Sequence, residues 1–376
     1  MTPLVSAVLI VRDEEAVLED CLRSLSGVAD EIVVVDTGSV DGTLAICRRH
    51  GVQLSHHAWH DDFAEARNVA LDRARGEWVL YIDADERLVD ADRASLESLL
   101  RSAEEVAFRV LLRPHLSMTP YREYRLWRND PRIRFEGRMH ERVVPAIQQV
   151  SVLDGKPIGD ADLFLEHIGY EGDQTRKHRR NLPLLRRFLE EEPEHLFALH
   201  HLATVLEGLG DDEEVDPLLE RGIGIVRDQT PPHPVGSLSY ASLIRRRQGR
   251  GEDFQALLDE SLALYPSNCV LLFVDGQAQL EHGNFSAALA RFEEIQRQVR
   301  LPVEEGTPAY SQPLVGELTH AQKALCLFRL ERYEEAAQSY DRAAECAPDE
   351  PTYPIRRDLA RSRARQTSPS AVGSAS

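Results

Sequence analysis

The sequence predicts a chain in two parts, an α/β domain built on a Rossmann-like mixed sheet followed by an all-α helical solenoid. Two observations lead to this prediction. The first half alternates short apolar runs with amphipathic segments, which is the order of a sheet covered by helices. After about residue 176 the strand-like runs stop, and the remaining chain is helical and weakly repetitive.

Composition excludes several classes of protein. The chain has 376 residues, with 44 Lys and Arg against 63 Asp and Glu, so its formal net charge is −19. This charge argues against a nucleic-acid binder, which needs a basic face. No apolar run approaches the roughly 20 residues of a membrane-spanning helix. The five cysteines show no C-x-x-C pair, and we read them as reduced thiols of a cytoplasmic protein.

Three runs of the first half are predicted to be parallel strands. Val5–Val11, Ile32–Val35 and Trp78–Ile82 are rich in β-branched or aromatic residues, as expected of strands buried on both faces. The stretches between and after them are predicted to be helical. Short strand-like runs between about residues 106 and 167, namely VAFRVLL, EYRLW, IRFEG and LFLEH, are expected to complete a mixed sheet.

The expected helices are Glu14–Leu25, Thr43–Arg49 and Ala64–Arg75. Asp62 and Glu65 have the spacing of a capping box at the start of the third of these helices. Strand, helix and strand joined by short connections indicate a parallel α/β sheet.

The second half contains a degenerate helical repeat. The segment at Leu280–Ile295 aligns with Phe328–Ala343, and two earlier segments follow the same pattern. Intervals between the matching positions run from 31 to 48 residues, around the roughly 34-residue tetratricopeptide period. The matching positions are Val215, Phe254, Phe285 and Tyr333. We therefore predict an α/β domain over residues 1–175, a tetratricopeptide-like domain over 176–365 and a disordered tail over 366–376.

Acidic residues follow two of the predicted parallel strands. Asp36 ends the second strand, and Asp83 and Asp85 follow the third, at the edge where open α/β sheets bind ligands. Paired carboxylates suit Mg²⁺ or Mn²⁺, which would neutralise a substrate diphosphate. Each motif alone also has a plainer interpretation, because aspartate is an ordinary turn residue and Asp-x-Asp is common in solvated loops.

Four segments together resemble a known family. VLIVRDEE, EIVVVDTGSVDGT, DDFAEARNVALDRARGEWVLYIDADE and IRFEGRMHE resemble the family 2 glycosyltransferases of the GT-A fold. More narrowly, they are similar to the bacterial subgroup in which tetratricopeptide repeats follow the catalytic domain. That subgroup includes peptide S- and O-glycosyltransferases of glycosylated bacteriocins. The resemblance covers about residues 4–181, and more loosely the repeats.

The resemblance implies roles for individual residues. Asp36 would contact the nucleobase, typically uracil, Asp83 the ribose or sugar, and Asp85 the metal. Arg67 and Asn68 match the segment that faces the nucleotide-sugar; taken alone, Arg67 would more ordinarily form a surface ion pair with Asp61 or Glu65. The nucleotide-sugar site that the resemblance implies comprises Val11, Asp36, Arg67, Asn68 and Asp83.

The general base and a second metal ligand are also expected from the resemblance. Inversion at an anomeric carbon needs a carboxylate that takes the acceptor proton. Where many relatives carry a Glu-Asp pair, this chain offers Glu136 and Glu141, and we favour Glu141. His167, within an H-x-G-Y element of the subgroup, would complete the metal site or touch a phosphate.

The expected activity is a metal-dependent, inverting hexosyl transfer from a nucleotide-sugar, such as a UDP-sugar, with Mn²⁺ or Mg²⁺ as cofactor. The acceptor is expected to be a peptide or protein side chain held by the repeats; a glycan or lipid-linked sugar is the alternative. The repeats could also join two copies in a homodimer. Two other classes are a nucleotidyltransferase, which would carry a glycine-rich loop after the first strand, and a non-catalytic repeat scaffold.

Overall fold

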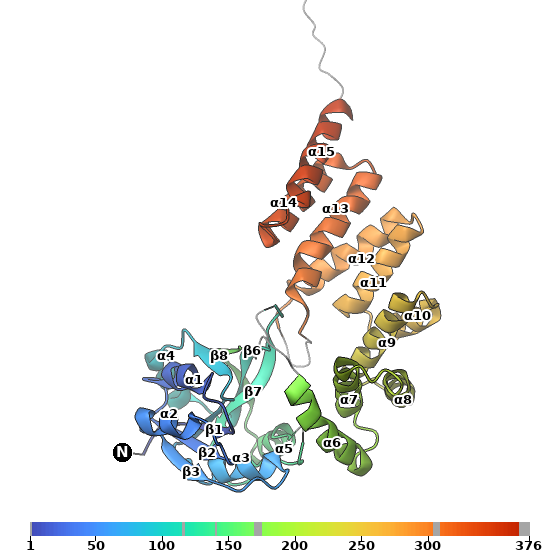
Figure 1. Ribbon diagram of the computed structural model, residues 1–376. Coiled ribbons are helices and arrows are strands. Elements are labelled where there is room, and N and C mark those ends of the chain that lie inside the picture. The colour runs from blue at the N-terminus through green and yellow to red at the C-terminus, as the bar shows by residue number, and fades with distance from the viewer. Residues whose placement is uncertain (1, 115–116, 140, 169–174, 304–308, 368–376) are drawn as a thin grey trace, which may run out of the picture. The chain divides into compact units, whose positions relative to one another are not determined.

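The computed structural model describes residues 2–114, 117–139, 141–168, 175–303 and 309–367. They form two compact units, which are named here the sheet unit (residues 1–212 and 303–309) and the helical unit (residues 213–302 and 310–376). Figure 1 shows both. The predicted domain boundaries at residues 175 and 365 stay predictions. Helix α15 (Thr352–Thr367) includes the first two residues of the predicted tail, and the rest of the tail lies outside the described residues.

An eight-stranded mixed sheet is the centre of the sheet unit. Its order is β3-β2-β1-β4-β7-β6-β8-β5. The first four strands of this order run parallel, while β7 is antiparallel to β4 and β6 is antiparallel to β7. The predicted mixed sheet is confirmed. The strands are β1 (Val5–Val11), β2 (Glu31–Asp36), β3 (Gln53–His56), β4 (Trp78–Tyr81), β5 (Glu86–Val89), β6 (Ala107–Arg113), β7 (Tyr121–Arg128) and β8 (Ile158–His167).

Helices cover both faces of this sheet. In β1, the side chains of Val5 and Leu9 pack with α1, α2 and α4, whereas that of Val8 packs with α3 and α5. Successive residues of a strand point to opposite faces, so one apolar strand contributes to two cores. These helices are α1 (Leu18–Leu25), α2 (Thr43–His50), α3 (Phe63–Leu71), α4 (Arg93–Ser102) and α5 (Val144–Asp154). Helices α6 (Thr175–Glu191) and α7 (Leu196–Leu209) also belong to the sheet unit.

Two sequence predictions for the sheet unit are wrong in detail. Helix α1 begins at Leu18 rather than Glu14, because the preceding loop is held by side chains of the 39–43 loop. There, the backbone N–H of Glu14 donates to Thr43 Oγ1 at 2.8 Å. The IRFEG segment is not a strand: within it the described residues show a single bridge, between Glu136 and Arg142.

The helical unit consists of consecutive antiparallel helices, and the four repeat positions have equivalent places in it. Val215, Phe285 and Tyr333 each begin a helix, and Phe254 is the N-cap of another. The predicted GT-A-type sheet domain followed by a tetratricopeptide-like solenoid is thus confirmed. The helices are α8 (Val215–Arg227), α9 (Gly236–Arg250), α10 (Gln255–Leu264), α11 (Cys269–Glu281), α12 (Phe285–Gln298), the π-helical turn Leu314–Leu318, α13 (Thr319–Arg329), α14 (Tyr333–Cys346) and α15.

Among the described residues, no helix combines the length and apolar composition that crossing a membrane requires.

Candidate active site

The carboxyl ends of β1 and β2 lie side by side. Val11 is paired with Asp36, and the Val11 carbonyl accepts hydrogen bonds from Thr37 N (3.0 Å) and Thr37 Oγ1 (3.1 Å). The structure therefore brings together the two predicted nucleoside-site residues of these strands.

Asp36 is 2% exposed, and its carboxylate is engaged by its own neighbourhood. Oδ1 accepts a hydrogen bond from Ser39 N (3.0 Å), and Oδ2 accepts one from Gly38 N (3.1 Å) and lies 3.0 Å from His56 Nδ1. Burial opposes ionisation, but these hydrogen bonds outweigh it and lower the pKa of Asp36. The carboxylate is thus held charged at the strand end, and it also forms the turn that follows.

A second group of charged side chains lies at the end of β4. Arg67, from α3, donates from Nε to Glu141 Oε1 at 2.5 Å, and its Nη2 lies 3.0 Å from Asp83 Oδ1. The plainer alternative, a surface ion pair with Asp61 or Glu65, is not what forms: Arg67 is only 8% exposed and joins the predicted sugar-site aspartate to the predicted base.

Aromatic rings and a further arginine complete this group. Tyr81 donates to Asp83 Oδ2 (3.1 Å), and the Arg67 and Arg125 guanidinium carbons lie 4.4 and 4.3 Å from the centre of the Tyr81 ring. Burial of the Arg67 guanidinium disfavours its charged form. Asp83, Tyr81 and Glu141 outweigh this effect and raise the pKa of Arg67 well above its ordinary value. Burial by itself would raise the pKa of Asp83, but the charges of Arg67 and Arg125 outweigh it and lower that pKa.

Sequence reasoning missed Glu86 and Arg125. Glu86 follows the Asp-x-Asp motif directly, is 2% exposed and forms a two-pronged ion pair with Arg125, at 2.8 and 3.2 Å. Burial raises the pKa of Glu86 to about 7 despite this partner. Glu86 Oε2 also accepts from Asp83 N, so the pair fixes the backbone of the Asp-x-Asp segment. Arg125 lies mid-strand in β7, where no short motif marks it.

Asp85 and His167 meet on the other side of the Asp-x-Asp segment. This segment forms a turn, since Glu86 N donates to Asp83 O. Asp85 Oδ2 lies 2.8 Å from His167 Nε2, and His167 Nδ1 lies 2.7 Å from the carbonyl of Pro114. The interaction with Asp85 raises the pKa of His167 to about 9. Two residues 82 positions apart, both predicted as metal ligands, are therefore neighbours.

Comparison with known proteins decides the family. Residues 6–142 match the model of Glycosyl transferase family 2. The chain carries a family 2 glycosyltransferase domain. A TPR repeat-containing protein of Synechococcus elongatus is 35% identical over 263 residues, which are 68% of this chain and 64% of that relative.

Two further relatives are named glycosyltransferases. The SPbeta prophage-derived glycosyltransferase SunS of Bacillus subtilis is 28% identical over 300 residues, 74% of this chain and 69% of that protein. The lipopolysaccharide core biosynthesis glycosyltransferase LpsC of Rhizobium meliloti is 37% identical over 155 residues, 37% of this chain and 57% of that protein.

The donor set of the glycosyltransferase domain fits a divalent cation. The carbonyl of Pro114 accepts the Nδ1 proton of His167, so Nε2, next to Asp85, is the ring nitrogen that could bind a cation in place of its own proton. Metal-ligating histidines are commonly oriented by such a second hydrogen bond. One carboxylate and one imidazole, both partly exposed, suit Mn²⁺, which accepts oxygen and nitrogen ligands.

The two candidate bases of the glycosyltransferase domain differ in position. The Glu141 side chain is 12% exposed and contacts Arg67, whereas Glu136 is exposed and is linked to Arg142 only through the backbone bridge. Of the two, the structure brings Glu141 into the charged group. His140, in the same EGRMHE segment, lies outside the described residues.

Asn68 does not face the charged group. Its amide donates to the carbonyl of Phe135 and accepts from the N–H of Phe135, each at 2.9 Å. This reciprocal pair attaches the 133–137 segment to α3. It gives Asn68 a positioning task, while its predicted contact with the nucleotide-sugar stays a prediction.

Proposed function

We propose that the sheet unit transfers a hexose from a UDP-sugar to an acceptor with inversion at the anomeric carbon. The observation that carries the proposal is the convergence of Asp83, Asp85, Arg67, Glu141 and His167 at the end of β4 in a family 2 domain. Residues from four separate stretches of the chain meet there.

In this proposal Asp85 and His167 Nε2 hold a Mn²⁺ or Mg²⁺ ion. The ion would supply positive charge to the departing diphosphate. Val11 and Asp36 would form the nucleoside side of the site, and Asp83, held by Arg67 and Tyr81, would contact the ribose or sugar.

Glu141 takes the acceptor proton. As the acceptor oxygen or sulfur bonds to the anomeric carbon, the bond from that carbon to the UDP oxygen breaks and its electron pair leaves with UDP. Arg67 fixes the direction of the Glu141 carboxylate through their ion pair. Arg67 is in turn fixed by Asp83 and by the face of Tyr81, so the base is positioned by buried contacts.

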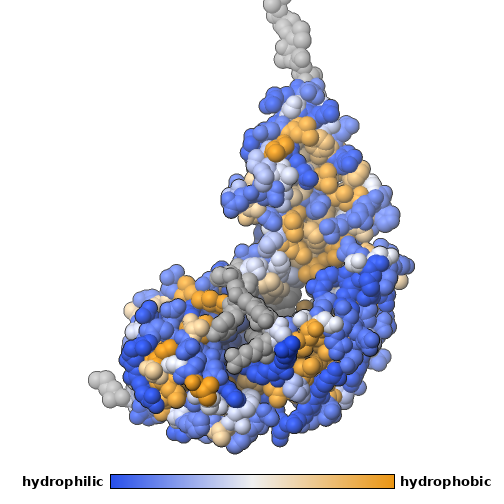
Figure 2. All heavy atoms as spheres, in the orientation of Figure 1, coloured by the Kyte–Doolittle hydropathy of each residue, from blue (hydrophilic) through white to orange (hydrophobic). Residues whose placement is uncertain are grey.

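The proposed acceptor is a peptide or protein side chain bound by the helical unit. Stacked helix pairs form extended binding surfaces, and Figure 2 shows hydrophobic residues over part of the visible face of this unit, among hydrophilic ones. Its exposed large apolar side chains are Val299, Leu301, Leu318, Ile355 and Leu359. The LpsC relative supports the alternative, a glycan or lipid-linked sugar. A cytoplasmic location is proposed because the five cysteines are free thiols.

The test is a donor panel followed by product detection. Calorimetry with UDP-, GDP- and dTDP-sugars, with and without Mn²⁺, should show binding of a UDP-sugar that Mn²⁺ strengthens. Product should then form by mass spectrometry on a peptide library but not on a glycan library. Binding of none of the donors would refute the proposed activity; transfer to glycans alone would refute the peptide acceptor.

A further inference from the structure

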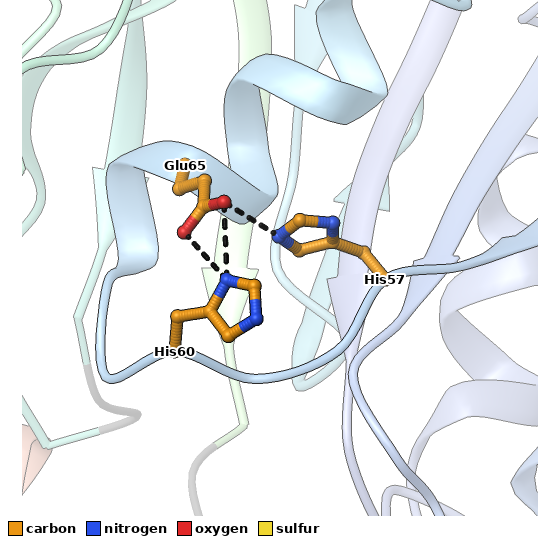
Figure 3. A group of neighbouring side chains, drawn as sticks. All are labelled: His57, His60 and Glu65. Carbon is orange, nitrogen blue, oxygen red and sulfur yellow. Dashed lines mark hydrogen bonds and ion pairs between the residues drawn. The ribbon is translucent and has the colours of Figure 1, made fainter.

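Three side chains outside the proposed donor site converge beside the start of α3. His57 directly follows β3, His60 lies in the loop that comes next, and Glu65 is in the first turn of α3. Figure 3 shows both imidazole rings directed at the Glu65 carboxylate. One ligand atom from each residue lies within 4.8 Å of the others.

The distances between these atoms match the distances between neighbouring ligands of one bound metal ion. His57 Nε2 lies 3.3 Å from Glu65 Oε1, and His60 Nδ1 lies 3.1 Å from Oε2 and 3.2 Å from Oε1. Ligands at about 2.0–2.1 Å from a tetrahedral Zn²⁺ are separated by about 3.3 Å. Little movement is therefore needed to place one cation among the three groups.

His57 provides a second, independent observation. Its side chain is 20% exposed, and its Nε2 atom is buried and makes no hydrogen bond with any described residue, although Glu65 is within reach. A buried polar atom without a partner is costly, and such atoms mark sites that a ligand, ion or water completes. The buried atom that makes no hydrogen bond is the one that lies beside the Glu65 carboxylate.

We propose that His57 Nε2, His60 Nδ1 and Glu65 form a Zn²⁺ site. Two imidazoles and one carboxylate favour a transition cation such as Zn²⁺ over Mg²⁺ or Ca²⁺, which prefer all-oxygen ligands. Three protein ligands leave a fourth position for water. This site is separate from the proposed Asp85 and His167 site, whose carboxylate and imidazole come from other elements.

The bound ion connects the loop after β3 to α3. The N–H of His57 donates to the carbonyl of Asp36 (2.9 Å), and Arg67 is two residues beyond Glu65 on the same helix. The Zn²⁺ ion would thus brace the elements that carry Asp36 and Arg67. It should stabilise the folded chain, since a ligand that binds only the folded state raises the melting temperature.

The experiment measures metal binding directly, without an activity assay. The chain carries Asp85→Asn and His167→Gln, so that the proposed donor-site metal does not contribute. Calorimetry with Zn²⁺ and absorption spectroscopy with Co²⁺, which reports tetrahedral coordination, then count the remaining sites. In this background we compare His60→Gln and Glu65→Gln with His56→Gln, a matched control one residue from His57 whose ring contacts Asp36 instead.

We expect one equivalent of Zn²⁺ to bind. His60→Gln or Glu65→Gln should weaken this affinity at least about 100-fold, and His56→Gln should leave it unchanged. Zn²⁺ in 100-fold excess over its Kd should raise the Tm of the background chain by about 5 °C. The Tm of the His60→Gln chain should not rise under the same conditions. Circular dichroism confirms that the exposed His60 variant is folded. No Zn²⁺ equivalent in the background chain, or equal binding by His60→Gln and His56→Gln, would overturn the site.

Discussion

The ends of β2 and β4 both present aspartates at the same edge of the sheet, yet they use them differently. At β2, the Asp36 carboxylate accepts hydrogen bonds from the turn that follows it and contacts His56. At β4, Asp83 depends on guanidinium groups from distant parts of the chain, and Asp85 depends on a histidine from β8. A carboxylate satisfied by its own turn contributes to the fold even without a ligand. One held by distant cations is arranged chiefly around a site.

The first test of this comparison is the variant Glu141→Gln, at the residue that Arg67 joins to Asp83 at the end of β4. The amide cannot take the acceptor proton, so transfer should fall by about 10²–10⁴-fold, while UDP-sugar binding by calorimetry stays nearly intact. Glu136→Gln is the matched control and should transfer at the wild-type rate.

The pH profile identifies the acceptor in the same variant. With a thiol acceptor, activity should recover as the pH rises toward about 8.5, because the thiolate then forms without a base. With a hydroxyl acceptor it should not recover. Wild-type rates in Glu141→Gln across this range would remove Glu141 from the mechanism and make Glu136 the next residue to test.

The second prediction concerns the support beneath Asp83. Arg125→Met leaves Glu86 buried without its partner, which should lower the free energy of unfolding by about 3–5 kcal/mol. The double variant Arg125→Met/Glu86→Leu removes both charges and should recover most of that loss. Urea unfolding followed by circular dichroism measures both. If the single and double variants lost the same stability, the ion pair would not be what holds this turn.

The third prediction concerns the metal. Asp85→Asn should weaken Mn²⁺ binding by more than the roughly 10–100-fold that loss of a supporting partner costs, and transfer at fixed Mn²⁺ should fall in parallel. Asp90→Asn, an exposed aspartate just after β5, is the control. Calorimetry with Mn²⁺ decides the point: equal Mn²⁺ affinity in the two variants would show that Asp85 is not a ligand.

The sequence predicted what depends on local pattern. The buried strands and the Asp62 cap follow from periodicity and capping, and the structure confirms them. Phe285 and Tyr333 were matched as repeat positions, and in the structure each is the first residue of a helix. The edge strand β3 (sequence QLSH) was missed because half-exposed polar residues carry no apolar signal.

Predictions that depend on long-range pairing were less complete. The resemblance assigned Asp85 and His167 to one metal site with a phosphate contact as the alternative for His167, and the antiparallel β5–β8 pairing shows how they meet. Glu86 was not singled out, because its partner in the buried ion pair is Arg125, 39 residues away, which no local window includes. His57 and His60 were not singled out, and Glu65 was named only for the capping box and as an alternative partner of Arg67, since the approach of the three depends on how the loop folds back on α3.

The smallest effect is expected at Asp36, where the two tasks of a strand-end aspartate can be separated. Asp36→Asn keeps the size of the side chain but replaces a charged acceptor by an amide, so the hydrogen bonds from Gly38 and Ser39 weaken. If the carboxylate also binds the nucleobase, UDP affinity measured without metal should fall by the equivalent of about 1.5–3 kcal/mol, the usual contribution of a hydrogen bond with a charged partner. If it serves the turn alone, Tm should fall by several degrees while UDP binds as before. Val40→Ala is the control, because it shortens an exposed side chain of the same loop and leaves the Asp36 carboxylate and its hydrogen bonds in place. Unchanged UDP affinity in Asp36→Asn together with a lowered Tm would assign Asp36 to the fold and confine the donor contacts to the β4 side of the sheet.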